Sequence, residues 1–498
     1  MYRCVGRGAT LPAIPLSSAP DSNPALPVVR PSACPGLMRV VAAADGGLCR
    51  IKLPGGRLAA AQARAIADAA RRYGSGLIDA TNRANLQLRG IRDGAAAPLA
   101  GALLDAGLGP NSAAYSATYS GACSGADTAG ARDADDARAA LAASDDVRNL
   151  MLSPLAGLDR AALVDSRALA RPLLDMLTHE PRRGELSPKF SIQLDGGEAV
   201  AALDHPHDIW LAAWRRDDGA LRIAAGLAGC PPVAPGDRPA SFDVAPHQAV
   251  ELVRALLLAF LDLAPAGVTR MRALLADGGE RALVARAQHY APFPLAADPV
   301  LAGWRRPPAD AALRFGARPT RDADRRSVGA QFVLGRLDAA LLERLAALAD
   351  ADGDGTLSMT PWQGVFVHGV RAARTPAVLA ALASLGLVCT PLDPLATLVA
   401  CTGSAGCAKA RADTKRDALA LAARIGRPLD VHLSGCERHC ALPHPAAYTL
   451  IAVAPARYDL YRRDTTVGPG APLARHLTID QAAARLTGAR HSQDTTDA

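Results

Sequence analysis

Aromatic residues are scarce in this chain of 498 residues, at 4% of the sequence, which argues against a surface that stacks nucleic-acid bases. Blocks of lysine and arginine are also absent, so the net charge of +7 is spread along the chain and favours no nucleic-acid partner. The most hydrophobic stretch, residues 249–264, contains Glu251, Arg254 and Asp262, which excludes a membrane span there. Residues 1–33 lack the apolar core of a secretory signal, so we expect a disordered leader and a cytoplasmic protein.

The chain contains an internal repeat. The segment "YGSGLIDATNRANLQLRGI" at residues 73–91 aligns without gaps with "DGDGTLSMTPWQGVFVHGV" at residues 352–370, an offset of 279 residues. An amphipathic helix is expected before each segment and another after it. A register that stays constant over this span indicates a duplicated unit rather than chance matches between glycines. The sequence therefore predicts an α+β half-domain that occurs twice.

The segment "TNRANLQLRG" at residues 81–90 alternates polar and apolar residues. Read with a period of two, it predicts a strand with one polar face, made by Thr81, Arg83, Asn85, Gln87 and Arg89. One interpretation is a half-buried strand whose polar face meets water. The other is that two guanidinium groups on a rigid strand bind a ligand with several carboxylates or phosphates. The second copy carries Trp362 and Phe366 there, which belong either to the core or to an apolar wall of the same cavity.

Four of the ten cysteines are clustered near the C-terminus, with C-x5-C and C-x3-C spacings: Cys401, Cys407, Cys436 and Cys440. Each pair follows an apolar strand, and the first pair also precedes a helix, where backbone dipoles favour thiolates. Structural zinc usually takes cysteines separated by two to four residues, so C-x5-C is an awkward fit. An iron–sulfur cluster accepts the wider spacing. We therefore expect a cluster, with zinc and unligated thiols as the alternatives.

This quartet, in a chain with a duplicated half-domain, resembles the sulfite and nitrite reductase superfamily, whose four cysteines bind a 4Fe–4S cluster beside a tetrapyrrole. The resemblance implies an α+β fold with two ferredoxin-like half-domains and α+β domains of the 4Fe–4S-binding type. Residues 81–90 resemble the strand that grips the tetrapyrrole carboxylates, and "VRNLMLSPLAG" and "LSPKFSIQLDGG" resemble two further binding segments. Together these segments implicate six substrate-binding residues: Arg83, Gln87, Arg89, Arg148, Asn149 and Lys189.

Within the superfamily, segments such as "ACTGSAGCAKA" and "HLSGC" are most similar to the branch that acts on precorrin-3A in aerobic cobalamin biosynthesis. This resemblance implies hydroxylation with O2, closure of a lactone, a 4Fe–4S cluster, a non-haem iron and electrons from NADH. The pattern G-x-G-x-x-G is not evident, so we expect NADH to act through a separate reductase. The alternative is a siroheme-dependent sulfite or nitrite reductase, although Ser191 stands where those reductases carry a second lysine.

Ligands for the non-haem iron are not resolved by the sequence. The run "DHPHD" at residues 204–208, His368, His439 and His444 are candidates, and an ordinary polar role is the alternative for each.

The predicted organisation, from the N-terminus, is a leader (1–33), a half-domain (34–100), a central α+β domain that is the first copy of the cluster type (101–240, with a mobile insertion at 111–146), a helical connection (241–325), a second half-domain (326–388) and a 4Fe–4S cluster domain (389–498).

Overall fold

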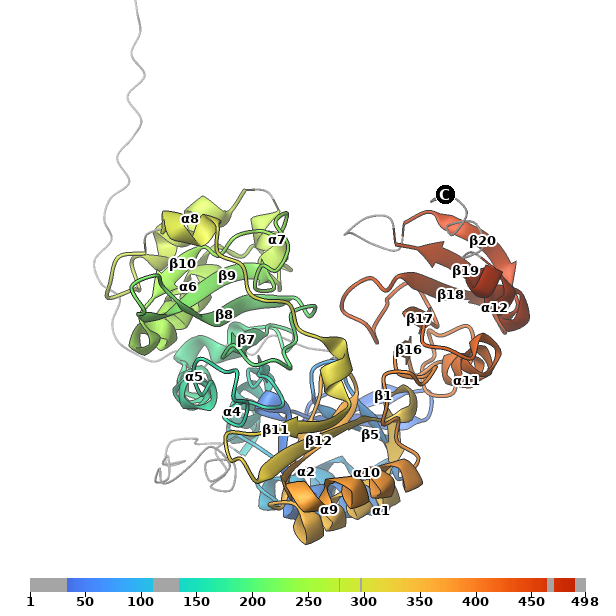
Figure 1. Ribbon diagram of the computed structural model, residues 1–498. Coiled ribbons are helices and arrows are strands. Elements are labelled where there is room, and N and C mark those ends of the chain that lie inside the picture. Colours follow the sequence, from blue (N-terminus) through green and yellow to red (C-terminus); the bar gives the residue numbers. More distant parts are fainter. Residues whose placement is uncertain (1–33, 111–133, 277, 296–297, 464–469, 489–498) are drawn as a thin grey trace, which may run out of the picture.

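The computed structural model describes residues 34–110, 134–276, 278–295, 298–463 and 470–488 (Figure 1). The predicted leader and residues 111–133 of the predicted insertion lie outside this part of the chain. Residues 134–146, expected in the mobile insertion, instead form a helix, α4 (Ala134–Asp146). Within the described ranges, no helix has both the length and the apolar character to cross a membrane.

The repeat builds two five-stranded sheets that lie side by side. The first has the order β1 (Val41–Ala43), β2 (Gly46–Ile51), β5 (Leu86–Ile91), β4 (Leu77–Ala80) and β13 (Arg336–Asp338). The second has the order β11 (Gly316–Pro319), β12 (Arg325–Gln331), β15 (Gly364–Arg371), β14 (Thr356–Met359) and β3 (Arg57–Ala59). Each sheet therefore takes its last strand from the other half of the repeat, in antiparallel pairings of β13 with β4 and of β3 with β14.

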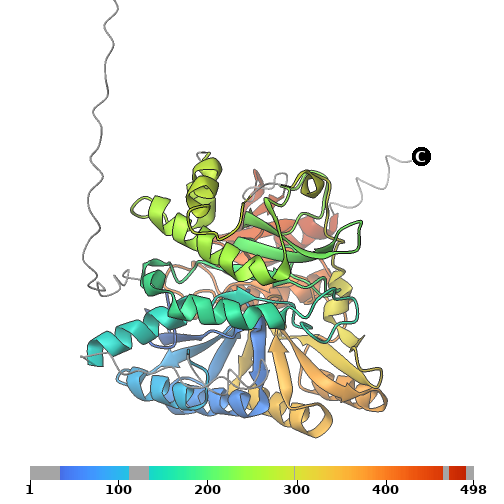
Figure 2. The same cartoon turned by 90° about the vertical axis from the view of Figure 1, so that its left-hand side faces the viewer.

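Helices cover the face of these sheets that points away from the rest of the molecule (Figures 1 and 2). They are α1 (Ala60–Tyr73), α2 (Ala96–Asp105), α9 (Ala339–Asp352) and α10 (Thr375–Ser384). The bounds of α1 and α9, and of α2 and α10, differ by the 279 residues of the repeat. The apolar faces of α1 and α9 pack together, with Ile66 and Leu345 fully buried in one shared core. The register predicted from the repeat is confirmed.

The central and C-terminal domains share one topology, so the duplication covers almost the whole described chain. In each sheet two parallel pairings are followed by two antiparallel ones. The central sheet comprises β6 (Leu150–Met151), β7 (Ile192–Asp195), β8 (His207–Arg215), β9 (Leu221–Gly229) and β10 (Phe242–Val244). The C-terminal sheet comprises β16 (Leu398–Ala400), β17 (Val431–Ser434), β18 (Tyr448–Ala454), β19 (Arg457–Arg462) and β20 (Pro472–Leu477).

Helices pack on both of these sheets. The central domain carries α5 (Arg167–His179), α6 (Ala249–Leu263), α7 (Met271–Leu275) and α8 (Glu280–Ala287), and the C-terminal domain carries α11 (Thr414–Ile425) and α12 (Ile479–Gly488). The apolar side chains of α6, such as Leu256 and Phe260, belong to the core of the central domain. The structure thus differs from the predicted division, because residues 242–263, expected in a helical connection, are a strand and a core helix of that domain. The central and C-terminal domains stand above the two half-domain sheets (Figure 1).

Candidate functional site

The four clustered cysteines lie at one edge of the C-terminal sheet. Cys401 follows β16 and Cys436 follows β17, and these strands are parallel neighbours, so their carboxyl ends meet. The amide of Cys401 donates to the carbonyl of Leu433 at 3.1 Å, which joins the two strand ends. The Cys401 sulfur accepts a hydrogen bond from the Gly435 amide, also at 3.1 Å. The sheet therefore places both cysteine pairs at a single edge.

The thiols of these cysteines influence one another electrostatically. The pKa of Cys440 is raised by partial burial and by the charges of Cys436, Cys401 and Cys407. A single zinc ion would hold thiolates about 3.8 Å apart. In the described part of the chain, however, the only three metal-type donors that lie within 4.8 Å of one another are in a different cluster. No three of the four sulfurs therefore lie that close together, which is wider than one zinc ion requires and favours the expected 4Fe–4S cluster over zinc.

Arg89 lies beneath the loop that carries the first cysteine pair. Its side chain is 3% exposed, and it donates to both carboxylate oxygens of Asp45 at 2.7 and 2.9 Å and to Asp79 at 3.1 Å. It also donates to the carbonyl of Gly406 at 2.8 Å, next to Cys407. All three guanidinium nitrogens of Arg89 therefore donate to protein groups, and the bond to Gly406 stabilises the loop of the first cysteine pair.

Arg83 does not share a strand with Arg89, and the prediction of one strand across residues 81–90 is wrong. The chain turns at Thr81, whose hydroxyl accepts hydrogen bonds from the amides of Arg83 and Asn85. Ala84 has a positive φ of 56°, which breaks the alternation of a strand. The side chain of Arg83 instead donates to the carbonyl of Lys189 at 3.0 Å. Burial and nearby Arg270 lower the pKa of Arg83 to about 10, as expected where cations converge.

Gln87 faces a cation that the sequence analysis missed. With its amide oxygen turned toward Arg50, Gln87 accepts two hydrogen bonds from that guanidinium, at 2.6 and 2.9 Å. Burial lowers the pKa of Arg50, while the charges of Cys34, Asp146 and Cys440 act in the opposite direction. Arg50 therefore contacts Gln87 and is close enough to Cys440 for their charges to interact. The pairing of β2 with β5 sets Arg50 opposite Gln87, and the sequence alone gives no sign of that register.

Arg148 and Asn149 hold the backbone around them. Arg148 is 2% exposed and donates to Asp145 at 3.1 Å and to the carbonyl of Leu108 at 3.0 Å. The amide of Asn149 donates to the carbonyls of Pro188 and Phe190, on either side of Lys189. With Arg83 they line a cavity of about 10 Å³, which holds at most one water. The bonds of Asn149 therefore position the segment that carries Lys189.

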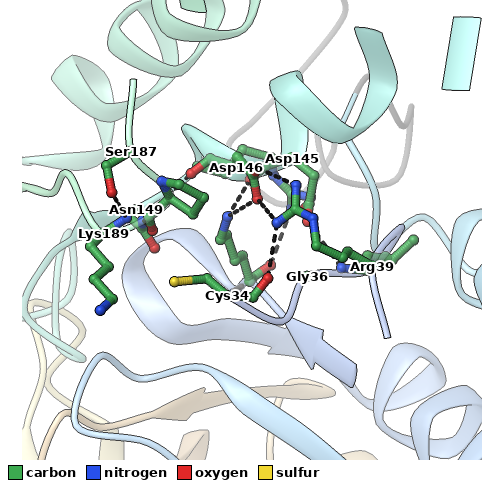
Figure 3. Close-up of polar contacts among 12 residues, drawn as sticks. Cys34, Gly36, Arg39, Asp145, Asp146, Asn149, Ser187 and Lys189 are labelled. Atoms are coloured by element: carbon green, nitrogen blue, oxygen red, sulfur yellow. Dashed lines mark hydrogen bonds and ion pairs between the residues drawn. The ribbon is translucent and has the colours of Figure 1, made fainter. Parts of the chain in front are cut away.

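The side chain of Lys189 is exposed, and its amine points away from the polar network behind it (Figure 3). That network joins Arg39 to Asp146 at 2.6 Å and buried Lys52 to the carbonyl of Asp145 at 2.8 Å. Of the six predicted substrate-binding residues, the structure thus brings Arg83 into contact with the backbone of Lys189, whose side chain is exposed. Arg89, Arg148 and Asn149 are bonded to protein groups, and Gln87 is bonded to Arg50.

A cavity of about 970 Å³ lies between the central and C-terminal domains. Its size is at the upper end of the range of ~300–1,000 Å³ that is usual for ligand sites. Trp210 and Leu227 give it apolar walls, and Arg272 adds a cation. On the other side it is lined by His439 and Leu442, which flank Cys440 in the sequence. The cavity therefore borders the loop of the second cysteine pair.

Two other predicted features belong to the interior. His368 is fully buried, and its ring nitrogens lie 2.9 Å from the Ser327 hydroxyl and 2.8 Å from the Ser358 hydroxyl. Both nitrogens are thus satisfied by the fold. Phe366 is fully buried and packs with Trp362 in a small apolar cluster, which supports the core interpretation of those aromatics.

Comparisons with known proteins agree with this architecture. The nitrite/sulfite reductase ferredoxin-like half domain matches residues 42–106 and 318–385, and the nitrite and sulphite reductase 4Fe-4S domain matches residues 143–295. The chain therefore belongs to the nitrite and sulfite reductase superfamily. The predicted resemblance and the predicted fold class of duplicated ferredoxin-like half-domains are confirmed.

Two curated relatives are similar to this chain in sequence, and one solved structure is similar to it in fold. The ferredoxin–nitrite reductase of Synechococcus elongatus is 30% identical, over 80% of this chain and 75% of its own length. The precorrin-3B synthase of a Sinorhizobium species is 29% identical, over 87% of this chain and 83% of its own length. The structure of the Mycobacterium tuberculosis NirA protein covers 89% of this chain and 79% of its own, with a TM-score of 0.68 and 18% identity, and is similar in fold. Both curated relatives carry the names of oxidoreductases.

Proposed function

We propose that this protein is a precorrin-3B synthase, which hydroxylates precorrin-3A with O2 and closes a lactone in aerobic cobalamin biosynthesis. The observation that carries the proposal is Ser191. Its hydroxyl is buried and unpartnered, and it lines the small cavity beside Arg83 where the reductases have a second lysine. One cation fewer weakens a site for sulfite or nitrite, whereas a large carboxylate-rich substrate depends on it less. The likeness to the Sinorhizobium enzyme over 87% of the chain supports the same reading.

In this proposal the chain binds the substrate through cations at the edge of an apolar cavity. Arg272 lines this cavity and faces the acetate and propionate groups, and Trp210 and Leu227 pack against the macrocycle. Arg83 and Lys189 lie together outside the cavity lining and bind carboxylates that extend beyond it. Each charge-assisted hydrogen bond to a carboxylate contributes about 1.5–3 kcal/mol. When held by Cys401, Cys407, Cys436 and Cys440, a 4Fe–4S cluster would supply electrons one at a time. Hydroxylation consumes two electrons and two protons per O2 and releases water, and a separate reductase oxidising NADH provides the electrons.

Incubation with precorrin-3A tests this function directly. The purified protein is mixed with the substrate under anaerobic conditions, reduced, and then exposed to O2. We expect a product that gains oxygen only after exposure, as measured by mass spectrometry with ¹⁸O2. Nitrite or sulfite reduction by the same preparation, with an intense Soret band from siroheme, would instead establish the second candidate. That candidate is supported by the 30% identity to a ferredoxin–nitrite reductase.

Replacing Arg83 by alanine is expected to weaken binding of the tetrapyrrole about 10- to 150-fold, which corresponds to the loss of one bond of ~1.5–3 kcal/mol to a carboxylate. The affinity is measured by tetrapyrrole absorption or fluorescence titration. Arg71→Ala is the control, because Arg71 is paired with Glu343 on the surface, at side-chain exposures of 45% and 49%. The iron–sulfur absorption stays unchanged in both variants. Equal affinities of R83A and wild type would leave Arg83 with only its bond to the Lys189 carbonyl.

A further inference from the structure

We propose that Asp204, His205 and His444 form a binding site for one divalent transition-metal ion, beside the cavity between the central and C-terminal domains. The three side chains come from two domains and offer one carboxylate and two imidazoles. Their donor atoms all lie within 4.8 Å of one another, and no other group of three such donors in the described ranges is as compact.

The distances among these donors suit ligands on one face of an octahedron. Asp204 Oδ1 lies 2.6 Å from His205 Nδ1, and Asp204 Oδ2 lies 3.6 Å from His444 Nε2. Adjacent ligands at about 2.1 Å from a metal are about 3 Å apart. Two histidines and one carboxylate on one face leave the opposite positions open, which is the arrangement that non-haem Fe(II) oxygenases use.

Each histidine ring has a backbone carbonyl near the nitrogen that faces away from Asp204. His205 Nε2 lies 3.3 Å from the carbonyl of Pro361, and His444 Nδ1 lies 3.5 Å from the carbonyl of Pro445. A carbonyl only accepts, so a ring with one proton carries it there and turns the lone pair of its other nitrogen toward the carboxylate. The other tautomer would let His205 Nδ1 donate to Asp204 Oδ1, but in this tautomer two lone-pair donors face each other across 2.6 Å, with His205 itself only 2% exposed. A cation between them satisfies both, and carbonyl-oriented imidazoles are the usual support of a metal ligand.

The neighbouring charges give the competing explanation. Arg314 donates to Asp204 Oδ2 at 3.4 Å and lies 4.0 Å above the ring of Trp362. Arg314 could therefore neutralise Asp204 in a purely structural ion-pair network. At 3.4 Å this bond is long, and it occupies only one of the two carboxylate oxygens, which leaves Oδ1 to the proposed ion.

The position of the site connects it to the rest of the molecule. Asp204 and His444 both line the cavity of about 970 Å³, and His444 lies four residues beyond Cys440. An ion held there adjoins both the space for a substrate and the loop of the cysteine cluster. Binding of a divalent ion rests on this geometry alone, whereas the choice of iron and its use with O2 rest on the proposed function.

Metal analysis and Mn²⁺ binding test the site without an activity assay. We expect the anaerobically purified full-length protein to contain about one iron atom per chain in excess of its acid-labile sulfide, since a 4Fe–4S cluster holds equal numbers of both. After mild chelation of that ion, Mn²⁺ is added and the free ion is followed by its electron paramagnetic resonance signal. Wild type should take up about one Mn²⁺ per chain.

Two ligand variants and one control complete the test. His444→Gln and Asp204→Asn should lose the excess iron and bind Mn²⁺ at least ~10-fold more weakly, with unchanged sulfide. His289→Gln should behave as wild type, because this exposed histidine contacts only the Ala285 carbonyl among the interactions of its ring. Equal iron and sulfide with no Mn²⁺ uptake in the wild type, or uptake unchanged in both variants, would overturn the site. Mn²⁺ uptake without oxygenation of precorrin-3A would refute the proposed function and leave the site standing.

Discussion

Replacement of Cys401 by serine is expected to remove the brown iron–sulfur chromophore and nearly all acid-labile sulfide. The Cys401 sulfur is held in place by the Gly435 amide at 3.1 Å and lies 3.4 Å from the Thr414 hydroxyl at the start of α11. A serine oxygen is a poor ligand for a soft iron–sulfur centre, and its shorter side chain cannot reach the same position. Absorption between 350 and 450 nm, with iron and sulfide analysis, measures the loss.

Cys389→Ser is the matched control for this variant. Cys389 also has a half-buried free thiol, but its sulfur contacts only the carbonyl of Leu387, at 3.5 Å, among the hydrogen bonds of its side chain. The control should retain full iron, sulfide and colour. Full iron and sulfide in C401S would remove Cys401 from the ligands of the cluster.

Replacement of Asp79 by asparagine is expected to destabilise the fold by about 3–5 kcal/mol, because it removes the buried carboxylate that Arg89 and Arg336 share. Asp79 is 7% exposed and accepts from Arg89 at 3.1 Å, from Arg336 at 2.9 Å and from the Thr402 hydroxyl at 3.0 Å. These partners belong to both half-domains and to the loop of the first cysteine pair. The shift of the urea unfolding midpoint measures the loss.

Asp350→Asn is the control, since Asp350 pairs with Arg64 at the surface, where both side chains are 44% exposed. Such exposed pairs contribute less than about 1 kcal/mol. If D79N were no less stable than D350N, the bonds of Asp79 to Arg89, Arg336 and Thr402 would not stabilise the fold. The loop of Cys401 and Cys407 would then be held by other contacts.

The stability should also depend on pH through Asp79. Burial opposes ionisation, but Lys415, Arg336 and Arg89 together hold the pKa of Asp79 below its ordinary value. A carboxylate with a depressed pKa in the folded state contributes stability above its unfolded pKa of about 3.9, and the contribution is lost as pH falls through the folded value. The wild type should therefore lose stability more steeply than D79N below about pH 4. Parallel curves of unfolding midpoint against pH for the two proteins would contradict this.

The repeat was predictable in detail because its signals are local. Glycines at turns and apolar spacing in the helices recur at a fixed offset, and the structure places α1 and α9 in that register. The exchange of β3 and β13 between the sheets was not predictable, since the partner of an edge strand is chosen by tertiary packing. The turn at residues 81–85 was missed because the alternation of polar and apolar residues continues through it without a break. The positive φ of Ala84 recurs at Gln363, the equivalent position of the second copy.

The candidate site was predictable where chemistry and spacing coincide, as in the cysteine quartet. The role of a residue was harder to predict from the sequence where it depends on which groups the side chain bonds in the folded protein. Arg89 and Arg148 have the right charge, but buried acids and carbonyls bind them. His444 was one of several candidate histidines, and only the folded chain brings it beside Asp204 from another domain.

The exchanged edge strands also affect how the protein is made. The first sheet is complete only when Arg336–Asp338 pairs with β4, long after β4 itself has left the ribosome. At roughly 5–20 residues per second this delay is on the order of 15–50 s. Throughout that time the nascent chain presents an open strand edge, to which other chains can pair. A truncated first half would keep that edge permanently, so the two halves should be obtained in soluble form only when they are produced together.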